Sequence, residues 1–280
     1  MEVRIDQPDT LEQHASHVGA TVISLMFHDV TDKPASSGFL QPSAQRYKHT
    51  RHQFRTYLNV VKKSGLDVLT GPDDVSMAER SGVVFTFDDG GSSAMLAADL
   101  LEECNWRGTF LITTDLIDTP GFLTQRQIFE LYRRGHVIGT HSCSHPDIFR
   151  LLTWFQKFTE WNKSREKLEQ IIGERVTVAS IPGGDGDRAT IEAAAAARLD
   201  ALFTSEWSVR PWLQTNVMCF GRAWMLRSTT PQTLSRWLRH PKIGLSPERS
   251  VRVAKNAAKA LMGPVYQRIM RQRRAVHEQS

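Results

Sequence analysis

Two carboxylates stand side by side where an apolar, strand-like run of the chain ends. The run Val83–Phe87 continues into Asp88 and Asp89, and two glycines follow. A turn at the strand tip lets both carboxylates reach one cleft, and like charges that close raise the pKa of one carboxyl group unless a cation lies between them. The structural alternative is that one aspartate caps a helix beginning near Ser92, while its neighbour is solvated.

Two histidines four positions apart follow a second run of the same kind. His136–Thr140 continues into His141 and His145, with Cys143 between them as a packing residue. Neutral imidazoles suit zinc and other late first-row divalent ions, whereas a histidine standing alone would be read as a core or surface residue. Together with Asp89 the pair forms a His₂Asp set. Such a set leaves coordination positions open for water, which predicts a catalytic rather than a structural metal site.

Strands and helices alternate along the chain, which predicts a mainly parallel α/β sheet. The predicted strands are short apolar runs, namely Thr21–Phe27, Val83–Phe87, Thr109–Ile112, His136–Thr140, Val176–Ile181 and Ala201–Thr204. The helix-like segments between them are His52–Lys63, Ser92–Glu103, Thr124–Arg134, Arg150–Ile172 and Arg188–Arg198. About seven strand candidates favour one closed (β/α) barrel, with an open doubly wound sheet as the alternative. In both architectures reactive groups gather at the carboxyl ends of the strands, where the acids and histidines stand.

Length and composition indicate a folded protein with one main domain. Of 280 residues, 40% are hydrophobic and 23% are charged, which allows a large buried core. Three scattered cysteines favour a reducing compartment, no apolar run has the length of a membrane span, and Met1–Ala20 is too polar for a secretory signal. We therefore expect a cytoplasmic protein. The predicted divisions are an N-terminal segment (1–20), a barrel domain (21–245) and a C-terminal basic helical extension (246–280).

The positive net charge of +5 belongs to the C-terminal extension. Residues 246–280 carry eight lysines and arginines against two glutamates, a net +6, which leaves −1 for the rest and argues against nucleic acid as a partner. Gly263 and Pro264 divide the extension into two short amphipathic helices. These helices either pack on the barrel or attach weakly, in a salt-sensitive way, to the anionic inner face of a membrane or a lipid-linked sugar. Alternatively, the extension alone could bind nucleic acid. The affinity for nucleic acid would then fall steeply with rising salt, and truncation of the chain at Ser246 would abolish the binding.

Two motifs carry a resemblance to a known family. Thr86–Gly90 holds the two aspartates and His141–Pro146 holds the two histidines. In this order and spacing they resemble the first two motifs of the polysaccharide deacetylases (the NodB-homology domain), and the resemblance covers roughly Thr21–Arg222. It implies a distorted (β/α) barrel of about seven strands and metal-dependent hydrolysis of an acetyl group from a sugar.

Carried over to this chain, the resemblance assigns a role to each of the four residues. Asp89, His141 and His145 would bind one divalent ion, and Asp88 would be the general base that deprotonates the attacking water. We expect zinc, with cobalt, nickel or manganese as alternatives, because a His₂Asp set discriminates little among these ions.

The third motif of the family departs from its usual pattern in this chain. Instead of an arginine two residues before a proline, a serine precedes the loop Pro182, Gly183 and Gly184, whose glycines can approach a substrate closely. The arginine that normally orients the base is therefore missing. Arg222, after the apolar stretch Val217–Gly221, is the candidate replacement, and the alternative is a surface cation.

The late histidine that serves as general acid in the family has no clear match. His28 ends the first strand next to Asp29, so we expect it to face the cleft and to contact substrate or donate the proton. Alternatively, an imidazole paired with Asp29 only orders the loop. The segment Thr31–Arg51 reads as a long loop over the barrel mouth. Further candidate substrate contacts are Phe39, Tyr47, Lys48 and His49 in that loop and, for stacking on a sugar face, Trp207.

The sequence thus predicts a metal-dependent hydrolase that removes acetyl groups from N-acetylated sugar units of a cell-surface or exopolysaccharide glycan or its precursor. One alternative is a C–N hydrolase on the same barrel acting on a small non-sugar amide, because a fold does not determine its substrate. The other is a catalytically inactive metal-binding scaffold. Asp88 argues against the scaffold, since a protein that only binds has no use for the base.

Overall fold

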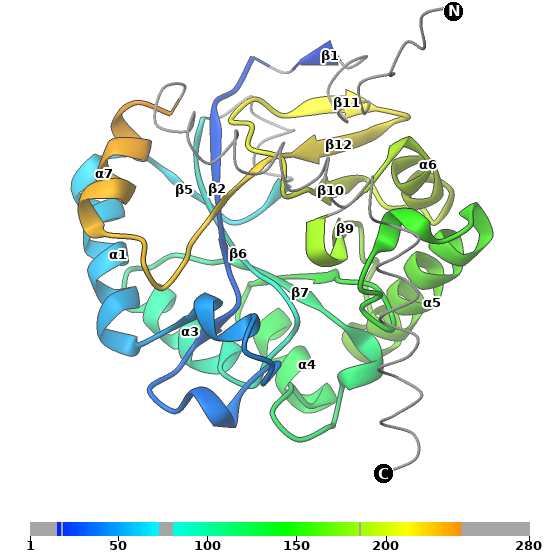
Figure 1. Ribbon diagram of the computed structural model, residues 1–280, viewed down its shortest axis with the longest axis horizontal. Coiled ribbons are helices and arrows are strands. Elements are labelled where there is room, and N and C mark those ends of the chain that lie inside the picture. Colours follow the sequence, from blue (N-terminus) through cyan, green and yellow to red (C-terminus); the bar gives the residue numbers. More distant parts are fainter. Residues whose placement is uncertain (1–15, 18, 73–80, 185, 242–280) are drawn as a thin grey trace, which may run out of the picture.

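The computed structural model describes residues 16–17, 19–72, 81–184 and 186–241 (Figure 1). The predicted basic helical extension, residues 246–280, lies outside the described residues, as does most of the predicted N-terminal segment 1–20. Within the described ranges, no helix combines the length and the apolar character that a membrane span requires.

Six parallel strands form where the apolar runs stand. They are β2 (Val22–Phe27), β6 (Gly82–Phe87), β7 (Thr109–Ile112), β8 (Val137–Thr140), β9 (Val178–Ser180) and β10 (Ala201–Phe203). Every residue of β2 and β6 is buried, as expected for strands covered on both faces. The hydrogen-bonded order is β10-β9-β8-β7-β6-β2, so the six carboxyl ends lie at one edge of the sheet.

The chain itself joins the two ends of this row of strands. β12 (Val217–Phe220) pairs with β10, β13 (Arg222–Trp224) pairs with β2, both pairings are parallel, and one residue, Gly221, separates the two strands. The result is an α/β fold with a mostly parallel sheet, consistent with the expected distorted barrel. The remaining strands are short, namely β1 (Ser16–His17), β3 (Asp29–Val30), β4 (Lys48–His49), β5 (Val68–Leu69) and β11 (Trp212–Gln214).

Helices surround the strands in Figure 1. They are α1 (Arg51–Ser64), α3 (Ala94–Glu102), α4 (Gln125–Arg133), α5 (Trp154–Ile172), α6 (Arg188–Ala196) and α7 (Pro231–Arg239). Three of them, α1, α4 and α5, begin with a threonine and a glutamine that cap each other's backbone, so local sequence defines these helix starts. α5 begins later than predicted because the short 3₁₀ turn Phe149–Leu151 precedes it. The predicted helical segments otherwise overlap the observed helices.

Alternation along the strands separates two layers of the core. Phe85 and Phe87 of β6 pack toward the helices. Val84 lies on the opposite side, in a cluster with apolar residues of β7, β9, β10 and β12. Thr86 follows on the side of Val84, and Asp88 continues the alternation beyond the end of the strand. The apolar interior of the sheet therefore gives way to polar groups at the carboxyl edge.

Gly221 has no room for a side chain at the point where β12 becomes β13. A Cβ atom there would lie 2.3 Å from the nitrogen of Ser208 and 2.6 Å from the oxygen of Glu206, both backbone atoms. We expect Gly221→Ala to lower the free energy of unfolding by about 1–3 kcal/mol in urea denaturation. Gly19→Ala is the control, because a Cβ at Gly19 has no heavy atom within 4 Å. Equal stability of the two variants would contradict this account of the junction.

Candidate metal centre and active site

Three predicted metal ligands meet at the carboxyl edge of the sheet. Asp89 follows β6, and His141 and His145 follow β8. The Nε2 atoms of both histidines lie 3.5 Å from Oδ1 of Asp89, and the three candidate ligand atoms all lie within 4.8 Å of one another. Oδ1 of Asp89 is buried and has no hydrogen-bond partner among the described residues. A buried, unpartnered carboxylate oxygen facing two imidazoles fits a divalent cation, and aspartate and histidine are ligands that such ions accept.

The backbone at this centre adopts conformations that side chains rarely favour. Asp89 has φ 75°, Ser142 φ 68° and His145 φ 53°, all in the left-handed region. Hydrogen bonds hold them, because Thr113 N donates to the Asp89 carbonyl and His145 N donates to Ser142 Oγ. Strained backbone of this kind persists where the surroundings over-determine it and clusters at functional sites.

Glu160 of α5 holds the loop that carries the two histidines. Its Oε2 accepts hydrogen bonds of 2.9 Å from the backbone nitrogens of Cys143 and Ser144, and its Oε1 accepts one of 2.8 Å from the Ser144 hydroxyl. Cys143 is half-buried, and its sulfur contacts the carbonyl of Glu160 at 3.4 Å, in agreement with a packing role. Glu160 was not predicted from the sequence, since an acid on an amphipathic helix carries no local sign of such a contact.

Ser180, at the end of β9, links a metal ligand to the predicted base. Nδ1 of His141 lies 2.6 Å from Ser180 Oγ and 3.1 Å from the Ser180 carbonyl, and the Ser180 hydroxyl donates to Asp88 Oδ1 at 3.1 Å. An imidazole whose Nδ1–H donates in this way presents Nε2 as the ligand atom. Burial lowers the pKa of His141 to about 3, which favours the neutral imidazole that a metal requires. Ser180 stands where the family that the motifs resemble has its arginine, and the sequence alone gave no sign of its role.

Arg222, the first residue of β13, contacts Asp88 with both terminal nitrogens. The distances are 2.7 Å to Oδ1 and 2.8 Å to Oδ2, and Nε of Arg222 donates to the carbonyl of Thr204 at 2.9 Å. Arg222 is 1% exposed and Asp88 is 3% exposed, so the surface-cation alternative is wrong. Burial raises the pKa of Asp88, but the Arg222 guanidinium outweighs it and holds that pKa well below the ordinary range. Asp88 is therefore an ionised carboxylate beside the three ligands.

The two neighbouring aspartates have opposite electrostatic environments. Burial raises the pKa of Asp89 to about 7, repulsion from Asp88 and Asp29 adds to the increase, and His28 opposes it. Neither aspartate caps α3, whose N-cap residue is Ser93, so the structural alternative for the pair is wrong. A bound cation would stabilise the ionised form of Asp89 by direct attraction.

His28 and Tyr47 lie together at the side of this centre. Their rings stack with centroids 4.4 Å apart and planes inclined by 27°, and Nδ1 of His28 is buried without a hydrogen-bond partner among the described residues. Burial raises the pKa of Tyr47, and the charges of Asp88 and Asp89 act in the same direction, whereas Arg46 opposes them. The tyrosine therefore lies within the electrostatic reach of the acid pair.

Some predicted substrate contacts lie elsewhere. Lys48 and His49 are buried, and His49 lies between core aromatic rings with Nε2 bonded to the carbonyl of Met225, so neither lines a groove. Trp207 packs edge-on against Trp237 of α7, with ring centroids 5.0 Å apart, and belongs to the apolar packing there. The sequence pattern predicted correctly that Trp207 follows the end of a strand. It gave no indication that α7 covers that side of the strand. Phe39, by contrast, lies against His145, with ring centroids 5.0 Å apart.

The loop after β9 brings two glycines with left-handed backbone next to the centre. Gly183 has φ 61° and Gly184 has φ 63°, and Pro182 before them is buried. A Cβ at Gly184 would lie 1.8 Å from Ser205 Oγ, so that glycine is required by packing. Gly183 is exposed, and a Cβ there would meet only the carbonyl of Asp147 at 3.7 Å. Gly183 is thus the glycine of this loop whose backbone is exposed.

Metal binding to the three ligands should be measurable without any substrate. We expect one equivalent of zinc to bind and, at a free concentration about 100 times Kd, to raise the Tm by roughly 5–10 °C. His145→Ala should abolish both the uptake and the stabilisation, because it removes one of the three ligand atoms. Equal uptake by the variant, measured with a chromophoric competitor, would show that zinc binds elsewhere.

Sequence comparison finds the same family that the motifs resemble. Residues 76–202 match the family model described as polysaccharide deacetylase. A curated relative, an uncharacterized 30.6 kDa protein of Geobacillus stearothermophilus, is 28% identical over 101 residues, which span 35% of this chain and 36% of that relative. The chain thus matches about a third of the relative's length.

Solved structures with the same fold include three proteins from different bacteria. The deacetylase PplD of Streptococcus pyogenes, in complex with acetate, is 19% identical with a TM-score of 0.63, over 76% of this chain and 96% of that chain. IcaB from Ammonifex degensii is 19% identical with a TM-score of 0.63, over 79% and 98%. A de-N-acetylase from Aggregatibacter actinomycetemcomitans is 17% identical with a TM-score of 0.63, over 75% and 96%. The part of this chain that matches the polysaccharide deacetylase model, residues 76–202, is somewhat less than half of its length and contains all three residues of the Asp-His-His centre.

Proposed function

We propose that this protein is a metal-dependent hydrolase that removes acetyl groups from N-acetylated sugar units of a cell-surface or exopolysaccharide glycan or its precursor. The observation that carries the proposal is the contact of Asp88 with Arg222 beside the three ligands. A scaffold that only bound metal would gain nothing from a buried, ionised carboxylate kept free of the ligand set. A hydrolase requires one, as a base for water.

The ligand triad and the base divide the chemistry between them. Asp89, His141 and His145 would hold the ion, which we propose to be zinc, with cobalt, nickel or manganese as alternatives. When bound, such an ion activates water and polarises a carbonyl group. Asp88 accepts the proton of the attacking water, while Arg222 and Ser180 keep its carboxylate in place through three hydrogen bonds.

The leaving group requires a proton, and His28 is the proposed donor. The water oxygen bonds to the carbonyl carbon, the carbon–nitrogen bond breaks, and the nitrogen takes up a proton, so the products are acetate and a free amine. His28 lies within electrostatic reach of both aspartates and its side chain is half-buried rather than fully enclosed, which supports it as the donor. The backbone of exposed Gly183 and the ring of Tyr47 are the proposed substrate contacts.

The glycan class rests on the family and on the names of the similar structures. One of those structures is a deacetylase with bound acetate and another is a de-N-acetylase, which supports an N-acetylated sugar as the substrate. The cytoplasmic location, with weak attachment to the inner face of a membrane through residues 246–280, is likewise a proposal. It predicts binding of the full chain to anionic vesicles that rising salt removes.

Acetate release tests the proposed function directly. The zinc-loaded protein is incubated with N-acetylglucosamine oligomers, with O-acetylated sugars and with simple acetamides, and free acetate is measured by a coupled enzymatic assay. We expect acetate from the N-acetylated oligomers. Acetate from acetamides alone would favour the small-amide hydrolase, and zinc uptake without acetate from any substrate would favour the scaffold.

A further inference from the structure

A buried ion pair lies directly behind the stacked rings of His28 and Tyr47. The two short strands β3 and β4 run parallel, with Asp29 opposite Lys48. Nζ of Lys48 lies 3.4 Å from Oδ2 of Asp29, and the two side chains are 1% and 5% exposed respectively. The Lys48 ammonium also donates to the carbonyls of Pro34 and Ser37, which fills its three donor positions.

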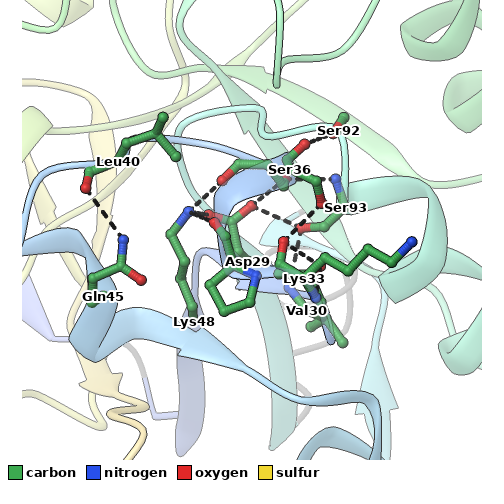
Figure 2. A network of polar contacts seen from close by, with 12 residues as sticks. Asp29, Val30, Lys33, Ser36, Leu40, Gln45, Lys48, Ser92 and Ser93 are labelled. Carbon is green, nitrogen blue, oxygen red and sulfur yellow. Dashed lines mark hydrogen bonds and ion pairs between the residues drawn. The ribbon is translucent and has the colours of Figure 1, made fainter.

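The Asp29 carboxylate joins this pair to the loop that carries the acid pair. Oδ1 of Asp29 accepts hydrogen bonds from Ser37 Oγ at 2.5 Å and from Ser93 Oγ at 2.8 Å. Ser93 Oγ in turn accepts from Val30 N at 3.1 Å, and Ser93 N donates to Ser37 Oγ at 2.8 Å. Figure 2 shows Asp29 at the centre of this network, with Lys48 on one side and Ser93 on the other. Three segments that are distant in sequence therefore share one anchor.

Two glycines allow the backbone to wrap closely around the carboxylate. A Cβ at Gly38 would lie 2.2 Å from Asp29 Oδ2, and a Cβ at Gly91 would lie 2.4 Å from Asp29 Oδ1. Gly91 stands two residues after Asp89, so the turn that follows the acid pair rests against Asp29. The carboxylate thus occupies a close-fitting enclosure of backbone and hydroxyl groups.

The register of β3 and β4 determines where the two rings lie. Because Asp29 pairs with Lys48, the residues immediately before them, His28 and Tyr47, are also opposite each other, and their rings stack. The interpretation that Asp29 serves as a partner for the His28 imidazole is not favoured, since its carboxylate is engaged by Ser37, Ser93 and Lys48. The connection from Asp29 to the His28 ring is therefore the backbone of the two adjacent residues.

Stability alone is a poor reason for burying these two charges. Taking an ammonium and a carboxylate out of water costs several kcal/mol per ion, and a well-packed apolar pair of similar volume is often as stable or more so. A buried ion pair defines a geometry, because each charged group must lie within hydrogen-bond distance of its own donors or acceptors. Here that geometry sets the position of a ring pair at the edge of the metal centre.

We propose that Asp29 and Lys48 are positioning residues that hold His28 and Tyr47 in place beside Asp88 and Asp89. This inference rests on the proposed function, because the rings have a catalytic use only if the centre hydrolyses a substrate. According to this proposal, breaking the ion pair lowers turnover by more than the loss of folding stability accounts for.

The main test variant is Lys48→Met, and Lys157→Met is its matched control. Lys157 is equally buried, at 2% exposure, and its Nζ lies 2.8 Å from Oδ1 of Asp187, the N-cap residue of α6 and no part of the β3–β4 pair. Four quantities are measured on each full-length variant: zinc affinity, Tm, kcat/KM for the N-acetylated oligomer, and the ring-current shift of the His28 signals in ¹³C-histidine NMR. Ser93→Ala is the milder second variant, since it removes the hydrogen bonds of Ser93 Oγ with Asp29 and with Val30 N but keeps both charges.

We expect Lys48→Met to lose the His28 ring-current shift and to lower kcat/KM on the order of 100-fold, with zinc affinity within threefold of the parent. Lys157→Met should lower the Tm and keep the ring-current shift. Ser93→Ala should reduce kcat/KM in the same direction by a smaller factor, which keeps the test valid if Lys48→Met does not fold.

Two results would overturn the inference. One is a Lys48→Met or Ser93→Ala protein that keeps the ring-current shift of His28. The other is a variant that loses this shift but keeps the kcat/KM of the parent. The NMR signature requires no turnover, so an inactive parent protein would refute the proposed function separately from the placement of the rings.

Discussion

Asp88→Asn is expected to lower kcat by about 10²–10⁴-fold while zinc affinity stays within threefold of the parent. The asparagine has almost the same shape, but its amide cannot accept a proton from water. The three ligand atoms belong to Asp89, His141 and His145, so the ion keeps its donors. The measurement is steady-state acetate release together with zinc titration of the same preparation.

The control for this prediction is Asp89→Asn, one residue along the chain. It removes a charged ligand with an unpartnered oxygen, so zinc affinity and turnover should fall together. The two variants have the same change of atoms and charge at adjacent positions. Two outcomes would contradict the assignment of Asp88 as the base. In one, Asp88→Asn keeps the turnover of the parent, and in the other it loses zinc affinity as Asp89→Asn does.

Arg222→Met is expected to lower the free energy of unfolding by about 3–5 kcal/mol and to remove most of the activity. The substitution leaves the Asp88 carboxylate buried without its cation, and Ser180 then provides the remaining side-chain hydrogen bond to it among the described residues. The backbone carbonyl of Thr204 also loses its donor. Urea denaturation of the metal-free protein measures the stability, so that zinc binding does not contribute to the difference.

A double variant separates the ion pair from general damage to the core. Arg222→Met combined with Asp88→Asn has no buried charge left at this position, so it should be more stable than Arg222→Met alone, yet equally inactive. Arg222→Lys keeps the charge but not the two parallel hydrogen bonds, and we expect intermediate stability. A double variant that is less stable than the single one would show that Arg222 acts through packing instead.

Local patterns in the sequence were sufficient for the six central strands, for five of the helices and for the ligand set, but not for β4, β13 or α7. The strand β7 lies at the residues predicted for it, and the helices α1, α4 and α5 begin at threonine–glutamine pairs that are readable in the chain. The acids and the histidines could be predicted together because each follows a buried parallel strand, and such strands end at one edge. Each of these predictions uses only residues that lie within a few positions of one another in the sequence.

Contacts between distant segments could not be predicted in the same way. Ser180 lies 92 positions from Asp88 in sequence, and Lys48 lies 45 positions from Ser93, with which it shares the anchor at Asp29. Lys48 and His49 follow a polar loop and looked suited to a groove, but the β3–β4 pairing buries them. Trp207 looked suited to a sugar, but α7 supplies an indole partner for it.

The sequence by itself determined the alternating strands and helices, the His₂Asp set and the acid next to it, because these follow from side-chain type and short-range spacing. The tertiary structure decided which distant groups complete the site: Arg222 and Ser180 on Asp88, Glu160 on the histidine loop, and the Asp29–Lys48 pair behind His28. The physical reason is that a buried charge needs a partner within hydrogen-bond distance, and only the tertiary fold supplies it. The chain runs from β12 through Gly221 into β13, and the pairing of β13 with β2 places Arg222 against the base.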